Sequence, residues 1–216
     1  QILPIGPTDF HNSPYSSMST FAGNHLLISL DLLVEDGLLD SKIFEGCQVA
    51  NLHKIIFNDV INFKLPILKQ VCQNFDKQAP IEMKISFEQF CIDQSYWLDD
   101  YSRYWALKEE NDQKSWFEWK LSTVQNTEYV HEAKVIQFLF HDQWHRLRQY
   151  CRGKGIQIIG DMPIYVGYDS ADVYANPELF QLDSEGRMKY QGGCPPCEYQ
   201  EEGQLWGSPL YNWQNH

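Results

Sequence analysis

Residues 156–172, IQIIGDMPIYVGYDSAD, decide the predicted fold. Their first five residues are mostly β-branched and show no helical period, which is typical of a buried strand. Helical patterns lie on both sides of the few predicted strands, so we expect an α/β fold with a parallel sheet covered by helices. In such folds ligands meet the protein at the carboxyl ends of the strands, and Asp161 stands at this position.

Asp161 is therefore the first candidate binding residue. Pro163 follows it, and Tyr165 and Tyr168 come next, so the segment combines a carboxylate with aromatic rings. This combination favours a site that binds a polar, ring-shaped substrate. The alternative is that Asp161 only caps the turn after the strand.

A second predicted strand covers residues 1–5 and leads into a loop over residues 6–24 that is rich in Gly, Pro, Ser and Asn. A loop of this length within a compact domain is usually functional. If the two strands are parallel, this loop leaves the sheet on the same side as Asp161. Together the loop and the segment after Asp161 would then form a cleft.

The composition indicates a folded, acidic protein. Of its 216 residues, 43% are hydrophobic and 14% are aromatic, which is ample for a packed core and excludes intrinsic disorder. The formal net charge of −12 argues against nucleic acid and anionic membranes as partners, since both require a basic surface. No apolar run reaches the length of about 18 residues that a membrane span needs. No signal peptide is evident, but the chain begins with Gln1, so a removed or missing N-terminal segment stays open.

Between the two predicted strands the chain is largely helical. An amphipathic helix is predicted over residues 65–78. One or two more are predicted over residues 87–110, the first of them starting at the capping-box pair Ser86 and Gln89. Because no strand pattern interrupts this stretch, we predict a helical insertion over approximately residues 42–128.

The clearest helix covers residues 135–151, where apolar residues recur at three- and four-residue steps on one face. The sequence Gly-Lys-Gly at 153–155 ends it. The predicted strand follows directly, so we expect this helix to pack on the sheet as the crossover connection. Upstream of the helix, Trp116 and Trp119 are predicted packing anchors.

Two histidines of this helix, His141 and His145, have the i, i+4 spacing of a helical zinc site. At about 100° per residue, both fall opposite the apolar face, in solvent. The residue after His141 is Asp142, whereas a metalloprotease needs a glutamate there as its base. We therefore interpret the pair as part of a solvated helix face.

Six cysteines occur, at positions 47, 72, 91, 151, 194 and 197. The first four stand singly in apolar helical segments and are interpreted as small buried hydrophobic residues in a reducing compartment. Cys194 and Cys197 form a CxxC motif, which is compatible with half of a zinc site or with a redox pair. No second CxxC supplies further ligands, and the two prolines between the cysteines indicate a loop. We favour a loop without metal or redox function and keep a thiol-based function as an alternative.

The chain contains no GxSxG motif, no Walker loop and no GxGxxG motif. What remains is a set of loops rich in Tyr, Trp, Asn, Gln and Asp. Aromatic faces stack on the apolar faces of sugar rings, and carboxylates and amides form hydrogen bonds with sugar hydroxyls. The alternative is that the aromatic loops only pack. The candidate residues for sugar binding are Ser13, Tyr15, Asp161, Gln204 and Trp206.

Six segments carry a family-level signal. They are QILPIGPT at 1–8, SPYSSMSTFAGNHLLISLDLLVEDGLL at 13–39, FCIDQSYWLDDYSRYWALKE at 90–109, QFLFHDQWHRLRQY at 137–150, IIGDMPIYVGYDSADVYANPELFQLD at 158–183 and GQLWGSPLYNW at 203–213. These segments resemble the amylomaltases, the 4-α-glucanotransferases or disproportionating enzymes of glycoside hydrolase family 77. They occur in the family's order and span nearly the whole chain.

The resemblance implies a (β/α)8 TIM barrel with helical insertions, of which this chain holds roughly strands two and three. It also implies a transferase that acts on α-1,4-glucans by a retaining mechanism. A carboxylate attacks the anomeric carbon and an acid protonates the leaving sugar. The 4-hydroxyl of another glucan or of glucose then resolves the covalent glycosyl-enzyme. The resemblance implies no cofactor, and it implies a cytoplasmic location or, alternatively, a plastid.

Individual residues carry over where the motifs match. The SPY segment implies Ser13 and Tyr15 as sugar contacts. Asp161, in GDMPIY, is similar to the family's substrate-binding aspartate at the third strand. Gln204 and Trp206, in GQLWG, resemble the mobile loop that covers bound glucan. The chain departs from the family in the CxxC loop, where an aspartate is usual.

The resemblance also bears on the extent of the chain. The family's nucleophilic aspartate, acid/base glutamate and third carboxylate lie in segments beyond the last residue, His216. We therefore expect an internal fragment of a longer enzyme, which carries part of the sugar-binding cleft and no catalytic residue of its own. An alternative from a different class is a complete, non-catalytic glucan-binding protein.

Overall fold

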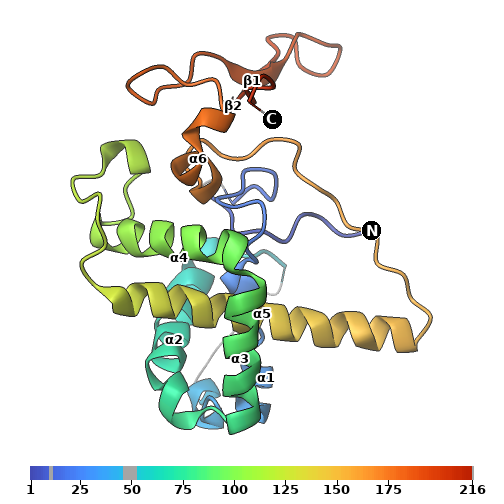
Figure 1. The fold of residues 1–216 in the computed structure, drawn as a ribbon. Coiled ribbons are helices and arrows are strands. Elements are labelled where there is room, and N and C mark those ends of the chain that lie inside the picture. Colours follow the sequence, from blue (N-terminus) through green and yellow to red (C-terminus); the bar gives the residue numbers. More distant parts are fainter. Residues whose placement is uncertain (10–11, 46–52, 216) are drawn as a thin grey trace.

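The computed structural model describes residues 1–9, 12–45 and 53–215 (Figure 1). The lower part of the view is a body of helices, and a small β-hairpin lies at the top beyond a short helix. The α-helices are α1 Leu30–Glu35, α2 Phe57–Gln78, α3 Ile81–Asp93, α4 Ser95–Glu110, α5 Thr127–Gly153 and α6 Ala171–Ala175. The 3-10 helices are η1 His25–Leu27, η2 Ser41–Phe44, η3 Trp116–Glu118 and η4 Pro177–Leu179, and the strands are β1 Gln191–Cys194 and β2 Gln204–Pro209.

Helix α5 is the central element of the helical body. It packs against α4, α2 and α3, and its residues Val135, Ile136 and Leu139 are buried. The helix predicted over 135–151 is confirmed, and it starts earlier than expected. Its true start is marked by the cap residue Asn126, whose side chain accepts the N–H two residues further on at 2.9 Å.

The expected packing of α5 on a parallel sheet is not seen within the described residues, where its partners are helices. Figure 1 shows the C-terminal half of α5 extending beyond the helical body. In this half Leu147 is 50% exposed and Tyr150 is 63% exposed, although both belong to the predicted apolar stripe. An uncovered apolar stripe of this kind is a surface that further protein usually covers.

The predicted buried strand over residues 156–160 is extended, but it is neither paired as a strand nor buried. Ile156 is 54% exposed and Ile159 is 64% exposed. Residues 1–5 are also extended, and the Ile2 N–H donates to the Ile159 carbonyl at 2.9 Å. Figure 1 shows the chain after α5 running up to the N-terminus and passing beside it.

A local β pattern sets the extended backbone, whereas a strand also needs neighbours that complete its hydrogen-bond ladder. Within the described residues no strand lies beside these two segments, so the predicted parallel sheet is not formed there. The sheet that the described residues do form is the antiparallel pair β1–β2.

The predicted helix start at Ser86 is wrong. Helix α3 begins at Ile81, directly after Pro80, and the Ser86 hydroxyl donates to the Glu82 carbonyl at 2.9 Å inside the helix. Proline suits a helix start because the N–H that it lacks would be unpaired there in any case. The region predicted to hold one or two helices contains two, α3 and α4.

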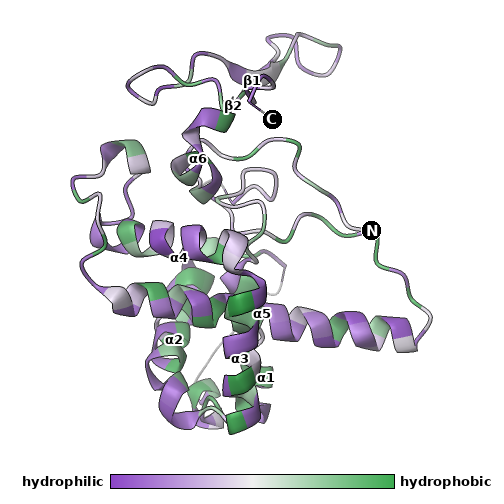
Figure 2. Cartoon of the chain, in the orientation of Figure 1, coloured by the Kyte–Doolittle hydropathy of each residue, from purple (hydrophilic) through white to green (hydrophobic). Residues whose placement is uncertain are grey.

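The hydrophobic core lies where α2, α4 and α5 meet. Leu68 on α2, Leu98 on α4 and Val135 on α5 are all fully buried. Figure 2 shows hydrophobic residues on the facing sides of the helices and hydrophilic residues around the outside. Trp116 and Trp119 pack against this core, which confirms them as packing anchors.

Two glutamines of α5 hold the N-terminal loop on the helical body. Gln137 accepts the Gly23 N–H at 2.7 Å and donates to the Gly23 carbonyl at 3.0 Å. Gln143 makes the same two bonds with Ser29, at 2.7 and 3.0 Å. Each side-chain amide thus satisfies both backbone groups of one residue, Gly23 in the loop or Ser29 at the start of α1, as a neighbouring strand would. The loop that carries the predicted site residues is therefore anchored to α5.

Candidate functional site

Tyr15 and Asp161 stand 146 residues apart in the sequence and meet in the structure. The Tyr15 hydroxyl donates to Asp161 Oδ2 at 2.7 Å, and Asp161 Oδ1 accepts the Met162 N–H at 2.9 Å. The hydrogen bond to the carboxylate raises the pKa of Tyr15, because an ionised phenol would lose this bond and face a negative charge. Asp161 Oδ1 thus stabilises the local turn, and Oδ2 binds Tyr15, which is another candidate residue.

Ser13 shapes the turn that presents Tyr15. Its hydroxyl accepts the Tyr15 N–H in a long hydrogen bond of 3.4 Å, and its carbonyl accepts the Ser16 N–H at 3.1 Å. The Tyr15 side chain is 50% exposed at this turn. Ser13 therefore lies close to Tyr15, and its role as a sugar contact stays a prediction.

The segment after Asp161 is joined to the same loop through backbone hydrogen bonds. The Gly167 N–H donates to the Ser17 carbonyl at 3.1 Å, and the Ala171 N–H donates to the Met18 carbonyl at 2.9 Å. A Cβ at Gly167 would lie only 3.0 Å from the Ser17 carbonyl oxygen, so this close approach favours glycine. These contacts set the relative position of the loop and the segment.

A cavity of about 580 Å³ opens beside Asp161. Its wall includes Asp161 and Tyr165 together with the apolar side chains of Phe21, Trp97 and Trp144. A mostly apolar lining with a few polar groups is typical of small-molecule sites, and so is a volume of a few hundred Å³. The cavity therefore combines a carboxylate with several aromatic faces.

The β1–β2 hairpin reaches the cavity through Tyr165. The Tyr165 ring lies 5.9 Å from the Trp206 ring and stacks on the Tyr211 ring at 6.1 Å. Trp206 Nε1 donates to Gln204 Oε1 at 2.9 Å, and both residues are exposed on β2. Tyr165 thus links Trp206 and Gln204 to the wall that holds Asp161. Whether these two residues cover a bound glucan stays a prediction.

The structure separates the predicted pair of Tyr165 and Tyr168. Tyr168 stacks on Phe117 with ring centroids 4.8 Å apart, and its hydroxyl donates to the Gly186 carbonyl at 2.5 Å. Its ring also lies 5.3 Å from the Trp116 ring. Tyr168 is therefore a packing residue, whereas Tyr165 lines the cavity.

The CxxC motif lies at the end of the hairpin strand. Cys194 is the last residue of β1, opposite Gln204, and Cys197 is exposed in the following loop. Both thiols are free. Residues before proline prefer extended backbone, and three residues of extended polyproline geometry span about 9 Å. A disulfide needs Cα atoms within roughly 7 Å, so the two prolines disfavour a redox pair.

Cys72, Cys91 and Cys151 lie outside the cavity wall, whereas His141 on α5 is part of it. Cys72 is buried as predicted, whereas Cys91 and Cys151 are partly exposed, and Cys47 lies outside the described residues. His141 and His145 on α5 are both exposed, as expected for a solvated helix face, although His141 also borders the cavity. In residues 1–9, 12–45 and 53–215, no group of three His, Cys, Asp or Glu side chains is arranged to hold a metal ion. No helix in this described part is long and apolar enough to cross a membrane.

Sequence reasoning did not assign most of the aromatic residues of the cavity wall to the site, among them Tyr211 and Trp97. The Tyr211 hydroxyl donates to the Ile164 carbonyl at 3.0 Å, which ties the hairpin end to the segment after Asp161. Tyr211 lies in the segment 203–213, and the resemblance of this segment to the family was the sequence feature that could have identified Tyr211. Trp97 lies on α4, where an aromatic residue at helical spacing is indistinguishable from a core residue.

Comparison with known proteins supplies the family. A family model described as 4-alpha-glucanotransferase matches residues 1–216. The chain belongs to the 4-alpha-glucanotransferase family. This confirms the resemblance carried by the six sequence segments.

Curated members of the family match along the whole chain. The 4-alpha-glucanotransferase of Aquifex aeolicus is 38% identical over 232 residues, covering 100% of this chain and 45% of that protein. The Thermus thermophilus protein of the same name is 39% identical, covering 99% and 44%. The chloroplastic/amyloplastic 4-alpha-glucanotransferase of Arabidopsis thaliana is 37% identical, covering 99% and 39%. The chain therefore spans less than half the length of these relatives.

Solved structures show the same fold. The amylomaltase from Streptococcus agalactiae in complex with acarbose is 32% identical and superposes with a TM-score of 0.90, over 99% of this chain and 46% of that chain. The amylomaltase from Corynebacterium glutamicum shares the fold at 20% identity, with a TM-score of 0.74 over 97% of this chain and 30% of that chain. The helix-rich chain thus has the architecture of the corresponding part of an amylomaltase.

Proposed function

We propose that the protein containing this chain is a 4-α-glucanotransferase, which transfers segments of α-1,4-glucan to an acceptor glucan or to glucose. We further propose that these residues form part of its glucan-binding cleft. The observation that carries this proposal is the Tyr15–Asp161 hydrogen bond beside a cavity walled by aromatic rings. The family match and the likeness to an amylomaltase in complex with acarbose support the substrate class.

Each candidate residue has a distinct role in this proposal. The Asp161 carboxylate has about four acceptor positions and accepts one hydrogen bond at each oxygen. The remaining positions are available to sugar hydroxyls. Tyr15 holds the carboxylate in place through its hydroxyl. Tyr165 and Trp206 offer ring faces on which the apolar face of a glucose unit stacks, and the Gln204 amide orients the Trp206 ring.

The proposed reaction is a retaining double displacement. Retention requires two carboxyl groups about 5 Å apart on opposite sides of the scissile bond. Transfer in preference to hydrolysis requires that the site exclude water and present an acceptor surface, and the exposed aromatic hairpin suits this purpose. The carboxylates that break the bond are proposed to lie in the remainder of the longer protein. This chain alone is then inactive.

The same proposal includes the barrel. With the remainder of the protein present, residues 1–5 and 156–160 become the second and third strands of a (β/α)8 barrel. Residues 42–128 then form the helical insertion, which includes residues 46–52 outside the described part. The hydrogen bond from Ile2 to Ile159 and the exposed apolar side chains of residues 156–160 support this arrangement. Both features leave edges that further strands would pair and cover.

The test uses the longest natural protein that contains this chain, incubated with maltotriose. A transferase produces glucose together with longer dextrins. Asp161→Asn keeps the size of the side chain and an acceptor oxygen but removes the charge, so we expect a higher KM for maltotriose. Absence of both products from the unaltered protein would reject the proposal. Retention of maltooligosaccharide binding without either product would identify a non-catalytic glucan-binding protein.

The names of the relatives indicate two alternative cellular compartments for the protein. Plant members of the family carry chloroplastic/amyloplastic names, and the matching bacterial members do not. We propose the cytoplasm as the site of action, with a plastid as the alternative. Fractionation of the source cells, followed by assay of maltotriose disproportionation, decides between them.

A further inference from the structure

Asp169 stands eight residues after Asp161 and is bound by the helical body from three directions. Its Oδ2 accepts Lys108 Nζ at 2.7 Å. Its Oδ1 accepts the Tyr104 hydroxyl at 2.8 Å and the Trp116 N–H at 3.1 Å. The Tyr104 hydroxyl also lies 2.9 Å from the Asp169 carbonyl. Tyr104 and Lys108 belong to α4, and Trp116 is the first residue of the 3-10 helix η3 that follows it.

The Lys108–Asp169 ion pair is largely removed from solvent. The Lys108 side chain is 9% exposed and the Asp169 side chain is 26% exposed. Lys108 Nζ otherwise contacts the carbonyls of Gln113 and Lys114, at 3.3 and 3.2 Å. Loss of the Asp169 charge would leave an ammonium group in a protected site with neutral acceptors only. Breaking one side of such a pair is costly because the remaining charge stays desolvated.

The same short segment is held from its other side by the loop that carries Tyr15. Backbone bonds from Gly167 and Ala171 reach that loop, and Asp172 Oδ2 accepts the Thr20 N–H at 3.0 Å. Residues 167–172 are therefore fixed between α4 and the loop. Figure 1 shows this region, at the start of α6, directly above α4.

Asp161 depends on this anchor because the chain before it is weakly held. The extended residues 156–160 make one backbone hydrogen bond with residues 1–5, and no sheet pairs them within the described residues. Farther along, the Ile164 carbonyl accepts the Tyr211 hydroxyl at 3.0 Å, and the segment at 167–172 is the next part held to the loop by backbone hydrogen bonds. The position of Asp161 and Tyr165 relative to Tyr15 thus depends on the Asp169 side as well as on the contacts of Tyr211.

We propose that the Lys108–Asp169 pair is a positioning element of the glucan-binding cleft. It locks residues 167–172 onto α4, and this holds Asp161 at hydrogen-bond distance from Tyr15 and Tyr165 against the hairpin. This inference rests on the proposed function and deepens it by assigning residues that touch no sugar. Lys108 and Asp169 are positioning residues and not catalytic ones.

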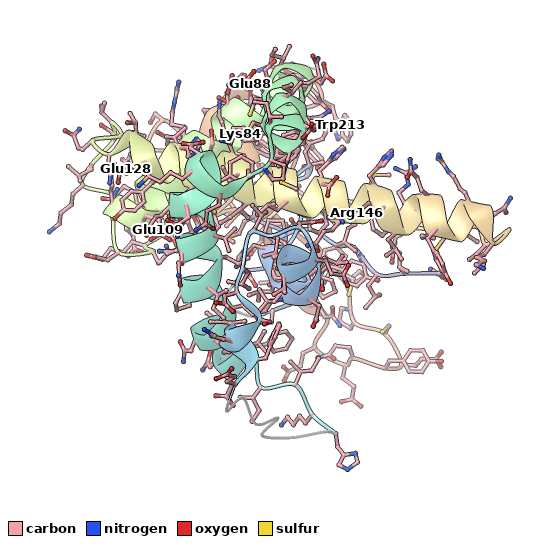
Figure 3. The ribbon with its side chains drawn as sticks, turned by 90° about the horizontal axis from the view of Figure 1, so that it is seen from below. Lys84, Glu88, Glu109, Glu128, Arg146 and Trp213 are labelled. Carbon is pink, nitrogen blue, oxygen red and sulfur yellow. The ribbon has the colours of Figure 1, made fainter. Side chains whose placement is uncertain are left out.

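A matched control lies on the next residue of the same helix. Glu109 Oε2 accepts Lys69 Nζ from α2 at 2.7 Å, the same distance as in the Lys108–Asp169 pair. Figure 3 labels Glu109 on the helical body seen from below, and Figure 1 shows α4 between α2 and α6. The two ion pairs thus leave α4 toward opposite neighbours. Glu109→Gln removes a charge from a pair of equal length that does not contact the cleft segment.

The first readout is kinetic, in the longest natural protein with maltotriose as the substrate. Asp169→Asn and Lys108→Met are each expected to lower kcat/KM on the order of tenfold, mainly through KM, because small displacements of binding groups are costly. Glu109→Gln is expected to change it less than about twofold. The double variant Lys108→Met/Asp169→Asn is expected to lose no more than the worse single variant, because the two side chains act as one unit.

The second readout does not depend on activity. Amide hydrogen exchange at Gly167 and Ala171 reports the two bonds that fix the segment to the loop, and it is expected to become several-fold faster in Asp169→Asn and not in Glu109→Gln. If the unaltered protein does not convert maltotriose, the proposed function fails and exchange alone decides the positioning role. If Asp169→Asn does not fold, Lys108→Met takes its place in the exchange experiment. Methionine keeps the unbranched, apolar part of the lysine side chain, so packing on α4 is preserved. Unchanged KM and unchanged exchange in a folded variant overturn the inference, as do equal effects in Glu109→Gln.

Discussion

Gln137 on α5 binds both backbone groups of Gly23, accepting its N–H at 2.7 Å and donating to its carbonyl at 3.0 Å. A Cβ at Gly23 would lie 2.0 Å from the ring of Phe140, three residues further along the helix. The loop with Tyr15 is therefore held at a distance from α5 that only glycine allows. The requirement is steric, because the backbone of Gly23 is not in the left-handed region.

We expect Gly23→Ala to destabilise the protein by about 1–3 kcal/mol, because the new methyl group displaces either Phe140 or the loop. Urea unfolding of the longest natural protein that contains this chain, followed by tryptophan fluorescence, measures the change. Gly153→Ala, at the end of α5, is the control, since nothing lies within 4 Å of its Cβ position. The control should be neutral or stabilising by up to about 1 kcal/mol. Equal stability of Gly23→Ala and the unaltered protein would contradict the steric argument.

Tyr15→Phe removes the donor to Asp161 and keeps the ring. Because Tyr15 is 50% exposed, the change should alter the free energy of unfolding by less than about 0.5 kcal/mol. The KM for maltotriose should nevertheless rise several-fold, since the Asp161 carboxylate loses the bond that orients it. Tyr150→Phe, on the outer half of α5, is the matched control and should leave KM unchanged. The role of Tyr15 would be refuted if both variants kept the KM of the unaltered protein.

Glu132 on α5 is expected to make stability depend on pH. It is 6% exposed, and its Oε1 has no hydrogen-bond partner. Burial raises its pKa to about 7, with Lys69 acting in the opposite direction and Glu109 adding to the rise. Unfolded glutamate has a pKa of about 4.3, so between that value and 7 only the folded state keeps the proton. Stability therefore falls as pH rises through this window and stays lower above it.

Glu132→Gln should remove this loss, so that the variant gains up to about 3 kcal/mol over the unaltered protein between pH 5 and pH 8. Urea unfolding of the longest natural protein that contains this chain, at both pH values, measures the difference. Glu128→Gln, at an exposed position one turn earlier, serves as the control. An identical pH dependence of stability in Glu132→Gln and the unaltered protein would exclude the buried carboxyl as its source.

The isolated 216-residue chain should aggregate or remain molten. Its extended segment exposes Ile159 at 64%, Met162 at 76% and Ile164 at 79%, and α5 exposes Leu147 and Tyr150. Contiguous apolar surface of this kind promotes association when nothing covers it. We expect binding of a hydrophobic dye and a broad thermal transition. A sharp cooperative melt of a soluble monomer would show that the exposed surface is tolerated.

The helices were predictable because their signals are local. The apolar period over residues 135–151 lies within one helix, and the Gly-Lys-Gly sequence ends it where expected. The helix starts were less predictable, since Ser86 has capping-box spacing and yet lies inside α3 after the stronger signal of Pro80. A capping motif acts only where the preceding residue has left the helix, and its spacing alone does not reveal this.

By itself the sequence determined the helical segments, the family and the residue types suited to sugar binding, because these depend on short-range patterns and on the order of motifs. Only the tertiary structure decided that Tyr15 touches Asp161, that Tyr168 packs on Phe117 and not in the cavity, and that residues 156–160 have no strand partner within the described residues. Each of these outcomes depends on partners distant in the chain. A hydrogen bond between side chains 146 residues apart, or a strand without neighbours, leaves no trace in the local pattern.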